Sequence, residues 1–526
     1  MSDPPVLQLQ LPSWKLEILG QWEFDRNSVT RTVDDGPLRK IEPVQQAAPQ
    51  SSDDTAKSSG VEEKMVTWNS ADDADNPRNW TRRAKWKNLI MVSLICFMSP
   101  LSSTILAAAL PQIRSDLHVT SEVELQAIFS IFTLGYTVGP IFMSPLSDVY
   151  GRVIVLQLSN VVNLLANAAC AAATSSTTLI ILRLVAGIGG STGLIIGGGV
   201  ISETFNPDER GFAVAVYSLA PIAGPTLGPI LGAFLIQRFG LPSIFISTSI
   251  ASAVLGAIGF FILRETNPRC ILRVRTVRLR KETGDPALRT QWDDQKISYT
   301  FLIAIRQPFY LLFTKPMAIL LVFFQSYLWG LLYLAFSIYI SIFNSVFQQP
   351  LDTASLNYLA FLCGNIVSVL VSSIISDRVY RDLKARFGRG IDKPIFRLPM
   401  TIGGVFVFAA GLIVIGWAAE RKISVLMADV GGALFAMGSF TAYQSLQVLM
   451  IDAFGVYATS ILAAAAMVRS IASFSFPLAA PALFASLGFG WGHTLIALIA
   501  LLFGSATVVF TWWLEDRLTI ELPAGY

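Results

Sequence analysis

The sequence predicts an all-α integral membrane protein with twelve transmembrane helices, six on each side of a long polar segment. Of its 526 residues, 53% are hydrophobic and only 14% are charged, whereas soluble proteins carry roughly 25% charged residues. So few charges cannot cover a water-facing surface on a chain of this length. The lengths of the apolar stretches and the distribution of Lys and Arg predict the same class.

Twelve apolar stretches are each long enough to cross a bilayer as a helix, which takes about 20 residues. They are 87–110, 124–146, 153–174, 177–201, 212–236, 243–263, 317–342, 354–376, 397–418, 423–448, 456–484 and 491–513. The longest polar break follows the sixth stretch, and duplicated six-helix halves are a known plan for transporters.

The chain is therefore expected to have five parts. Its beginning is rich in Ser, Asp, Pro and Gln, a composition typical of disordered segments. The parts are a disordered cytosolic N-terminal tail (1–80), a first six-helix bundle (81–263), a central cytosolic loop (264–315), a second six-helix bundle (316–513) and a cytosolic C-terminal tail (514–526).

The orientation follows from the excess of Lys and Arg on the cytoplasmic side of membranes. With the N-terminus inside, the inside segments from residue 78 onward hold 26 Lys and Arg residues. The outside loops then hold four, namely Arg114, Arg238, Arg421 and Lys422. This split predicts that both termini are cytosolic and that the number of spans is even.

Several classes of function find no support in the residues. The four cysteines are far apart and there are two histidines, which leaves little material for a metal site. No Walker lysine, nucleotide-binding glycine pattern or H-E-x-x-H occurs, so neither an enzyme nor an ATP-driven pump is indicated. We expect no catalytic residue, no cofactor, no metal and, at a net charge of +3, no nucleic acid partner.

The short inside loop after the second span carries Asp148, Gly151 and Arg152 within the run Ser-Pro-Leu-Ser-Asp-Val-Tyr-Gly-Arg. An acid and a base four residues apart can pair and stabilise helix ends, although a solvated turn is the simpler interpretation. This run resembles the loop between helices two and three of the major facilitator superfamily. The resemblance implies two six-helix bundles around a central cavity, with Asp148 and Arg152 locking an inner gate and tying the halves together.

The fourth span contains Arg183 and Gly187. A charge inside a span is costly and is a functional hypothesis by default, the alternative being an arginine bonded to carbonyls for packing. The pair resembles the family's R-x-x-Q-G motif, which is implicated in proton transfer, with Ala186 where glutamine is usual.

The fifth span and its approach contain Gly211, Gly224, Pro225 and Gly228. Small residues let helices approach closely, and prolines permit bending. The spacing resembles the antiporter motif of the same superfamily. The resemblance implies export of substrate against protons.

Further stretches between residues 76 and 515 are similar to the fungal twelve-span drug:proton antiporters. They include Asn-Pro-Arg-Asn-Trp before the first span, Ser-Pro-Leu-Ser-Ser-Thr within it, and Phe-Pro-Leu-Ala-Ala-Pro in the eleventh. A second copy of the gate loop is expected after the eighth span, where Asp377 and Arg378 are either its relic or part of a solvated basic loop.

Other polar residues within the spans are candidates for the transport path. Arg469 lies mid-span and needs a partner or water, so a gating or structural role is expected. Asp429 either takes part in proton coupling or binds a cation, or else is hydrated near the outer interface. The remaining candidate cavity-lining residues are Ser102, Ser103, Gln325, Tyr443 and Gln444.

These observations and the resemblance together predict a secondary transporter that exports amphipathic small molecules (drugs, toxins or secondary metabolites) in exchange for protons. It is expected to act as a monomer within the lipid bilayer of the plasma membrane, or else of the vacuole. The alternatives are an importer of a nutrient or polyamine with the same fold, and a transport-inactive membrane sensor, which the long N-terminal tail suggests.

Overall fold

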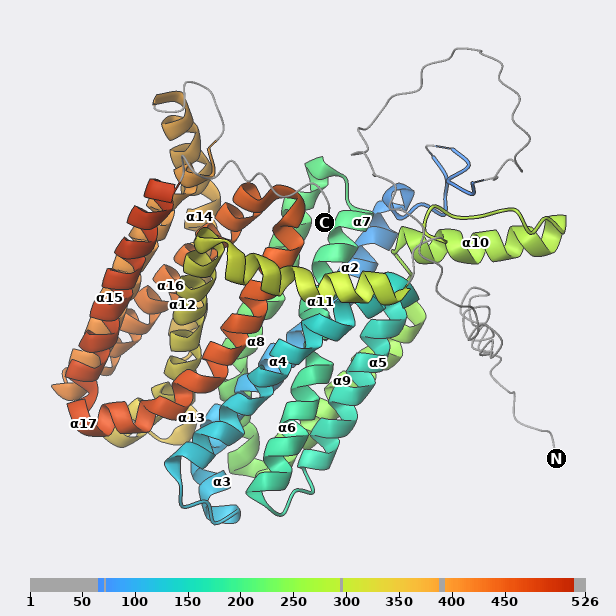
Figure 1. Ribbon diagram of the computed structural model, residues 1–526. Helices are drawn as coiled ribbons and strands as arrows, with labels where there is room; N and C mark the ends of the chain where they lie inside the picture. Colours follow the sequence, from blue (N-terminus) through green and yellow to red (C-terminus); the bar gives the residue numbers. More distant parts are fainter. Residues whose placement is uncertain (1–64, 71, 294–296, 387–392, 515–526) are drawn as a thin grey trace, which may run out of the picture. The chain divides into compact units, whose positions relative to one another are not determined.

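The structure, a computed structural model, describes residues 65–70, 72–293, 297–386 and 393–514 (Figure 1). The described chain is almost entirely helical, with one isolated bridge between Met65 and Arg289. Most of the tail expected to be disordered, and nearly all of the C-terminal tail, lie outside the described residues.

The prediction of twelve membrane-crossing helices is confirmed. Ten spans are separate, and the last two form the 57-residue element α17 (Ala458–Leu514), which is interrupted where Gly488 takes φ 71° and ψ 175°. The first six spans run through α2 (Arg82–Thr104) with α3 (Leu110–Asp116), α4 (Glu122–Tyr150), α5 (Arg152–Cys170), α6 (Ser176–Gly190) with α7 (Thr192–Thr204), α8 (Pro207–Phe239) and α9 (Pro242–Ile262). The other six run through α12 (Pro316–Ser341), α13 (Leu351–Leu356) with α14 (Leu359–Arg386), α15 (Leu398–Glu420), α16 (Val425–Phe454) and α17.

Short polar side chains and prolines mark where the spans begin. Ser121, Ser175 and Ser424 each accept the backbone N–H of the residue three positions on, which satisfies one of the free donors at the start of α4, α6 and α16. Pro242 and Pro316 occupy the first turn of α9 and α12, where a missing N–H costs nothing. Local sequence thus sets the span starts.

The central segment 264–315 differs from the expected loop because it contains two helices, α10 (Pro268–Thr283) and α11 (Ile297–Thr314). The second contacts α4, α12 and α17, and in Figure 1 it runs across the spans rather than along them. It carries exposed apolar side chains such as Leu302 and Phe313. Arg306, Gln307 and Pro308 interrupt its apolar residues, so the sequence does not mark it as a span within the polar break.

The helices belong to two compact units. Residues 68–271 and 292–516 form one unit that holds all twelve spans. In it the two halves meet where α4 packs on α17 and where α8 packs on α13 and α14. The other unit includes residues 272–291, in which Arg280 donates to the Leu288 carbonyl at 2.8 Å.

Candidate functional site

A buried arginine occupies the middle of the first half. Arg183 of α6 is 0% exposed, and its two terminal nitrogens donate to the carbonyls of Ser102 and Ser103 at 2.8 and 3.0 Å. These carbonyls lie at the end of α2, which continues as a 3₁₀ turn from Ile105 to Ala109, and such ends leave carbonyls short of intrahelical donors. The Phe132 ring lies 4.5 Å from the guanidinium carbon. The cation is therefore fully enclosed, with its Nε the one nitrogen that has no partner.

The second half carries an arginine of a different kind. Arg469 of α17 donates to the Tyr443 hydroxyl at 2.7 Å, and its guanidinium carbon lies 4.8 Å from the centre of the Trp329 ring. The Trp329 and Tyr443 rings are themselves 4.8 Å apart, and Gln325 donates to the Tyr443 carbonyl at 3.4 Å. All three members of this cluster, Arg469, Trp329 and Tyr443, are half-buried. We call them the Arg469 cluster.

One hydroxyl pair joins the two halves between these arginines. The Ser103 Oγ of α2 lies 3.1 Å from the Tyr333 hydroxyl of α12, and both side chains are buried. Arg183 donates to the carbonyl of the same Ser103, and Trp329 of the Arg469 cluster lies about one helical turn before Tyr333 on α12. A second hydroxyl pair, Ser99 with Tyr136 at 2.7 Å, lies within the first half. Polar groups from both halves therefore converge at mid-span.

A charged cluster lies at one end of the first half. Arg152 pairs with Asp148 at 2.6 Å and with Glu203 at 2.9 Å, and it donates to the Ser147 hydroxyl at 2.6 Å. The Asp148 side chain is 46% exposed and that of Glu203 is 13% exposed. These residues come from α4, α5 and α7. One guanidinium thus links the ends of three spans.

A buried carboxylate caps the same helix end. Glu265 accepts the backbone N–H groups of Arg152 at 2.8 Å and Val153 at 3.0 Å, which satisfies donors at the start of α5. Gly151 stands before them at φ 102°, where a Cβ would lie 2.5 Å from the Glu265 carboxylate. Glycine is needed there because its φ is positive and because a Cβ would collide with the carboxylate. Burial raises the pKa of the Glu265 carboxyl, Glu203 adds to the rise, and the backbone donors oppose it.

The second half has a counterpart of the Arg152 arrangement. Arg397 lies 3.5 Å from Asp452 of α16, donates to Ser376 of α14 at 3.4 Å and stacks 4.3 Å from the Tyr380 ring. It stands just before α15, the ninth span, as Arg152 opens the third. Each arginine pairs with an acid at the end of the following span. The side chain of Asp377, expected in this role, lies outside the described residues.

The chain matches a known protein family over most of its length. The model of the Major Facilitator Superfamily matches residues 92–477. The chain belongs to the major facilitator superfamily. It is 37% identical to the efflux pump vrtL of Penicillium aethiopicum, over 86% of this chain and 90% of that one. It is 35% identical to the efflux pump radE of Floropilus chiversii, over 83% and 81%.

Solved structures agree on the fold. An inward-open conformation of the xylose transporter XylE from E. coli superposes with a TM-score of 0.59 at 13% identity, over 81% of this chain and 95% of that one. A bacterial homologue of the human lysosomal transporter Spinster, inward-facing and unoccupied, gives 0.57 at 13% identity, over 84% and 99%. At such identities the likeness shows the major facilitator fold alone.

The glycines of the antiporter-type motif divide into two kinds. A Cβ on Gly228 would lie 2.7 Å from the Leu101 carbonyl, and one on Gly224 would lie 3.0 Å from the Phe97 carbonyl, so α8 packs directly on α2. Thr104 donates to the Pro225 carbonyl at 2.9 Å, whose usual donor is missing because residue 229 is proline. Gly211 has open space around it. It therefore makes no close approach.

The glycine next to the buried arginine also lies at a close approach. Gly187 of α6 faces the Phe132 carbonyl of α4, and a side chain there would overlap that carbonyl. Gly135 on α4 approaches the backbone at Gly187 in return. The pair holds α4 and α6 together beside Arg183.

The remaining predicted cavity residues separate in space. Asp429 of α16 accepts the Tyr339 hydroxyl at 3.3 Å, fourteen residues before Tyr443 on the same helix. That separation corresponds to about 21 Å along a helix. Gln444 follows Tyr443, and its buried Oε1 has no hydrogen-bond partner. Ser102 contributes its carbonyl to Arg183, while its own buried hydroxyl is also without a partner.

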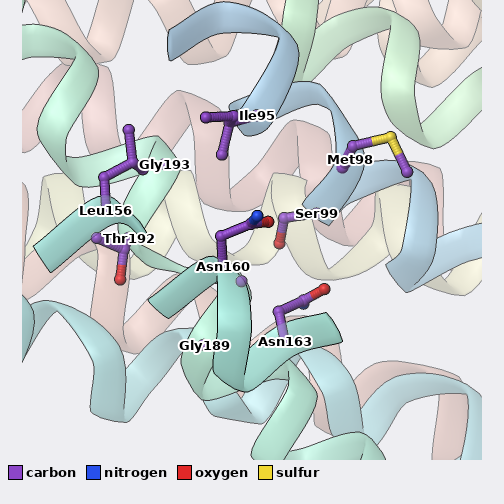
Figure 2. Close-up of a pocket in the computed structure, with 10 residues that line it drawn as sticks. Ile95, Met98, Ser99, Leu156, Asn160, Asn163, Gly189, Thr192 and Gly193 are labelled. Carbon is purple, nitrogen blue, oxygen red and sulfur yellow. The ribbon is translucent and has the colours of Figure 1, made fainter. Parts of the chain in front are cut away.

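The pocket in Figure 2 contains no residue of the Arg469 cluster. It is lined from α2, α5 and the α6–α7 span by Ile95, Met98, Ser99, Leu156, Asn160, Asn163, Gly189, Gly190, Thr192 and Gly193. All of these residues come from the first half. The pocket has room for about one water molecule, so it is too small for a substrate.

Several site residues were not recognised from the sequence. Tyr333 lies in an uninterrupted apolar run, in which an aromatic residue is ordinarily a packing or interface residue. Glu265 follows the sixth span, in a segment whose composition is that of an ordinary solvated loop. The one hint of its role is the start of α5. Gly151 precedes this helix and has no side chain to cap it, so a distant residue has to do so.

Proposed function

We propose that this transporter exports amphipathic small molecules in exchange for protons. It acts as a monomer in the plasma membrane, with both termini in the cytosol. The two halves rock against each other around the Ser103–Tyr333 contact and the Arg469 cluster. Rocking is the mechanism expected of paired six-helix bundles.

The observation that carries the proposal is the Ser103–Tyr333 contact between the halves. Alternating access needs contacts that form in one state and break in the other. A neutral hydrogen bond contributes about 1 kcal/mol net, which thermal motion can break. The flanking cations Arg183 and Arg469 make this the point at which a charged or polar substrate would alter the contact between halves.

Export is supported by α8 and by relatives. Gly224 and Gly228 let α8 pack closely on α2. Both belong to the motif that resembles the one in exporters. Two relatives that align over most of their length bear the name efflux pump. Export by this chain is the direction that both facts favour.

Proton coupling requires a group whose proton affinity differs between the two states. Asp148 is half exposed and pairs with the largely buried Arg152. Protonation of Asp148 would remove one of the two ion pairs that hold Arg152 in place. We therefore assign gating and coupling to Asp148, Gly151 and Arg152, with Arg183 and Gly187 as the fixed frame of the first half and Arg469 as the movable cation of the second.

Of the rivals, a nutrient importer would have the same fold, since that fold is also found in a proton:xylose symporter. A polyamine importer is disfavoured because the two cations at mid-span would repel a polycation. The tail that would serve a sensor lies mostly outside the described residues. Deleting residues 1–64 should spare flux in a transporter and abolish the output of a sensor.

The test is flux in inside-out membrane vesicles with an imposed pH gradient. We expect accumulation of an amphipathic dye only when the vesicle interior is acidic. Arg183→Ala should lower the initial rate at least tenfold, because it leaves two buried carbonyls unpaired. Arg238→Ala, which removes an exposed arginine in the last turn of α8, should not. Uptake that ignores the gradient, or that runs only in right-side-out vesicles, contradicts the proposal.

A further inference from the structure

Arg469 has no counter-charge in the part of the chain that the structure describes. Its guanidinium bonds with the Tyr443 hydroxyl and lies over the Trp329 and Tyr443 rings, and no described carboxylate is within ion-pair distance of it. A guanidinium has five N–H donors, so most of its hydrogen-bonding capacity is unused. A cation inside a span requires a counter-ion or water, and no carboxylate of the described residues supplies that counter-ion.

The two arginines at mid-span differ in what they leave open. Arg183 is fully buried, and its terminal nitrogens are committed to the carbonyls of α2. Arg469 is half-buried, as are Trp329 and Tyr443. The first arginine is therefore a closed structural group. The second is partly exposed, as are the two rings beside it.

The acidic groups of the described spans are engaged elsewhere. Asp429 bonds with Tyr339 about 21 Å along α16 from Tyr443. Glu203 is bound to Arg152, and Glu420 accepts the backbone N–H of Phe489. Mid-span therefore carries positive charge that no described side chain neutralises, and this charge favours an anion over a neutral molecule or a cation.

We propose that the Arg469 cluster is the substrate-binding subsite and that it takes an aromatic organic anion. A carboxylate would accept two parallel N–H bonds from Arg469, and the adjoining ring would pack on Trp329. Tyr443 orients the guanidinium through its hydroxyl. This assignment rests on the proposed function and names the substrate class for it.

The subsite is tested by binding to the purified full-length chain in lipid nanodiscs, with tritiated 2-naphthoate and its uncharged methyl ester as probes. We expect the wild type to bind naphthoate at least tenfold more tightly than the ester. Arg469→Gln should weaken naphthoate binding at least tenfold and leave ester binding unchanged, while Arg469→Lys retains part of the preference. Trp329→Phe should weaken both probes, because it reduces the stacking surface but keeps the charge.

Arg238→Gln is the matched control, since it removes an exposed arginine that stacks on Phe234 away from the cluster. Unchanged ester binding also shows that Arg469→Gln is folded. The inference is overturned if the wild type does not prefer naphthoate, if it binds neither probe up to millimolar concentration, or if Arg469→Gln affects both probes equally. Arg469-dependent binding without gradient-driven flux would overturn the export proposal alone, and gradient-driven flux without anion preference would overturn this inference alone.

Discussion

The Ser103 hydroxyl of α2 and the Tyr333 hydroxyl of α12 lie 3.1 Å apart, so two buried side chains 230 positions apart in the chain connect the halves. Ser103 also donates to the Pro100 carbonyl at 2.8 Å. If that bond uses the serine proton, Tyr333 is the donor in the inter-half contact.

The inter-half contact should behave as a coupled pair. Ser103→Ala and Tyr333→Phe should each lower the thermal stability of the detergent-solubilised protein, because each leaves a buried hydroxyl or carbonyl without its partner. The double variant should be less destabilised than the sum of the singles, with a coupling of about 1 kcal/mol. Thermal unfolding of all four proteins measures this, and strict additivity would show that the contact contributes nothing.

Two glycines of α8 should respond differently to an added methyl group. Gly228→Ala puts a Cβ 2.7 Å from the Leu101 carbonyl, so we expect a loss of stability of about 1–3 kcal/mol from overpacking and a large loss of flux. Gly211→Ala meets open space and should be neutral or stabilising by up to about 1 kcal/mol. Similar effects of the two variants in melting and flux assays would refute the distinction.

Glu265 should make stability depend on pH. Its pKa is raised by burial, so the folded protein holds this proton more tightly than the unfolded chain. The contribution to stability is complete below the unfolded pKa and is lost as the pH rises through the folded pKa. We expect the melting temperature to fall across that window in the wild type and to fall less in Glu265→Gln.

The exposed Glu282, paired with Arg278 on α10, provides the control for this experiment. Glu282→Gln removes a carboxylate that is paired within α10, and its pH profile is compared with that of Glu265→Gln. At neutral pH Glu265→Gln should also reduce stability, since an amide accepts from the N–H groups of Arg152 and Val153 less strongly than a carboxylate does. A profile with the same slope in all three proteins would rule out Glu265 as its source.

The break between the last two spans should depend on Gly488 and Glu420. The Glu420 carboxylate accepts the N–H groups of Phe489 at 2.9 Å and Gly490 at 3.2 Å, directly after the glycine at positive φ. Gly488→Ala should cost about 1–2 kcal/mol from the left-handed backbone, and Glu420→Gln about 1 kcal/mol from the weaker cap. Ala485→Gly, three residues earlier in regular helix, should cost about 1 kcal/mol through propensity alone and leave flux intact, whereas Gly488→Ala should reduce it.

Hydropathy and charge alone determined the class of this protein. Lipid-facing helices must be apolar for about 20 residues whatever their neighbours are, so the twelve spans could be predicted from local composition. The presence of Arg183 and Arg469 within spans marked them as functional candidates for the same reason. Helix α11 could not be predicted in the same way, because Arg306, Gln307 and Pro308 interrupt its apolar residues.

Tertiary structure alone decided what these charged and polar residues do. Arg183 reaches carbonyls 80 and 81 positions away, and Glu265 caps a helix that begins 113 positions earlier. Both arginines have the same local appearance in the sequence, an isolated cation in an apolar run. Only the packing of distant helices encloses Arg183 and leaves Arg469 half-buried beside Trp329, because a hydrogen-bond partner is chosen by proximity in space and not along the chain.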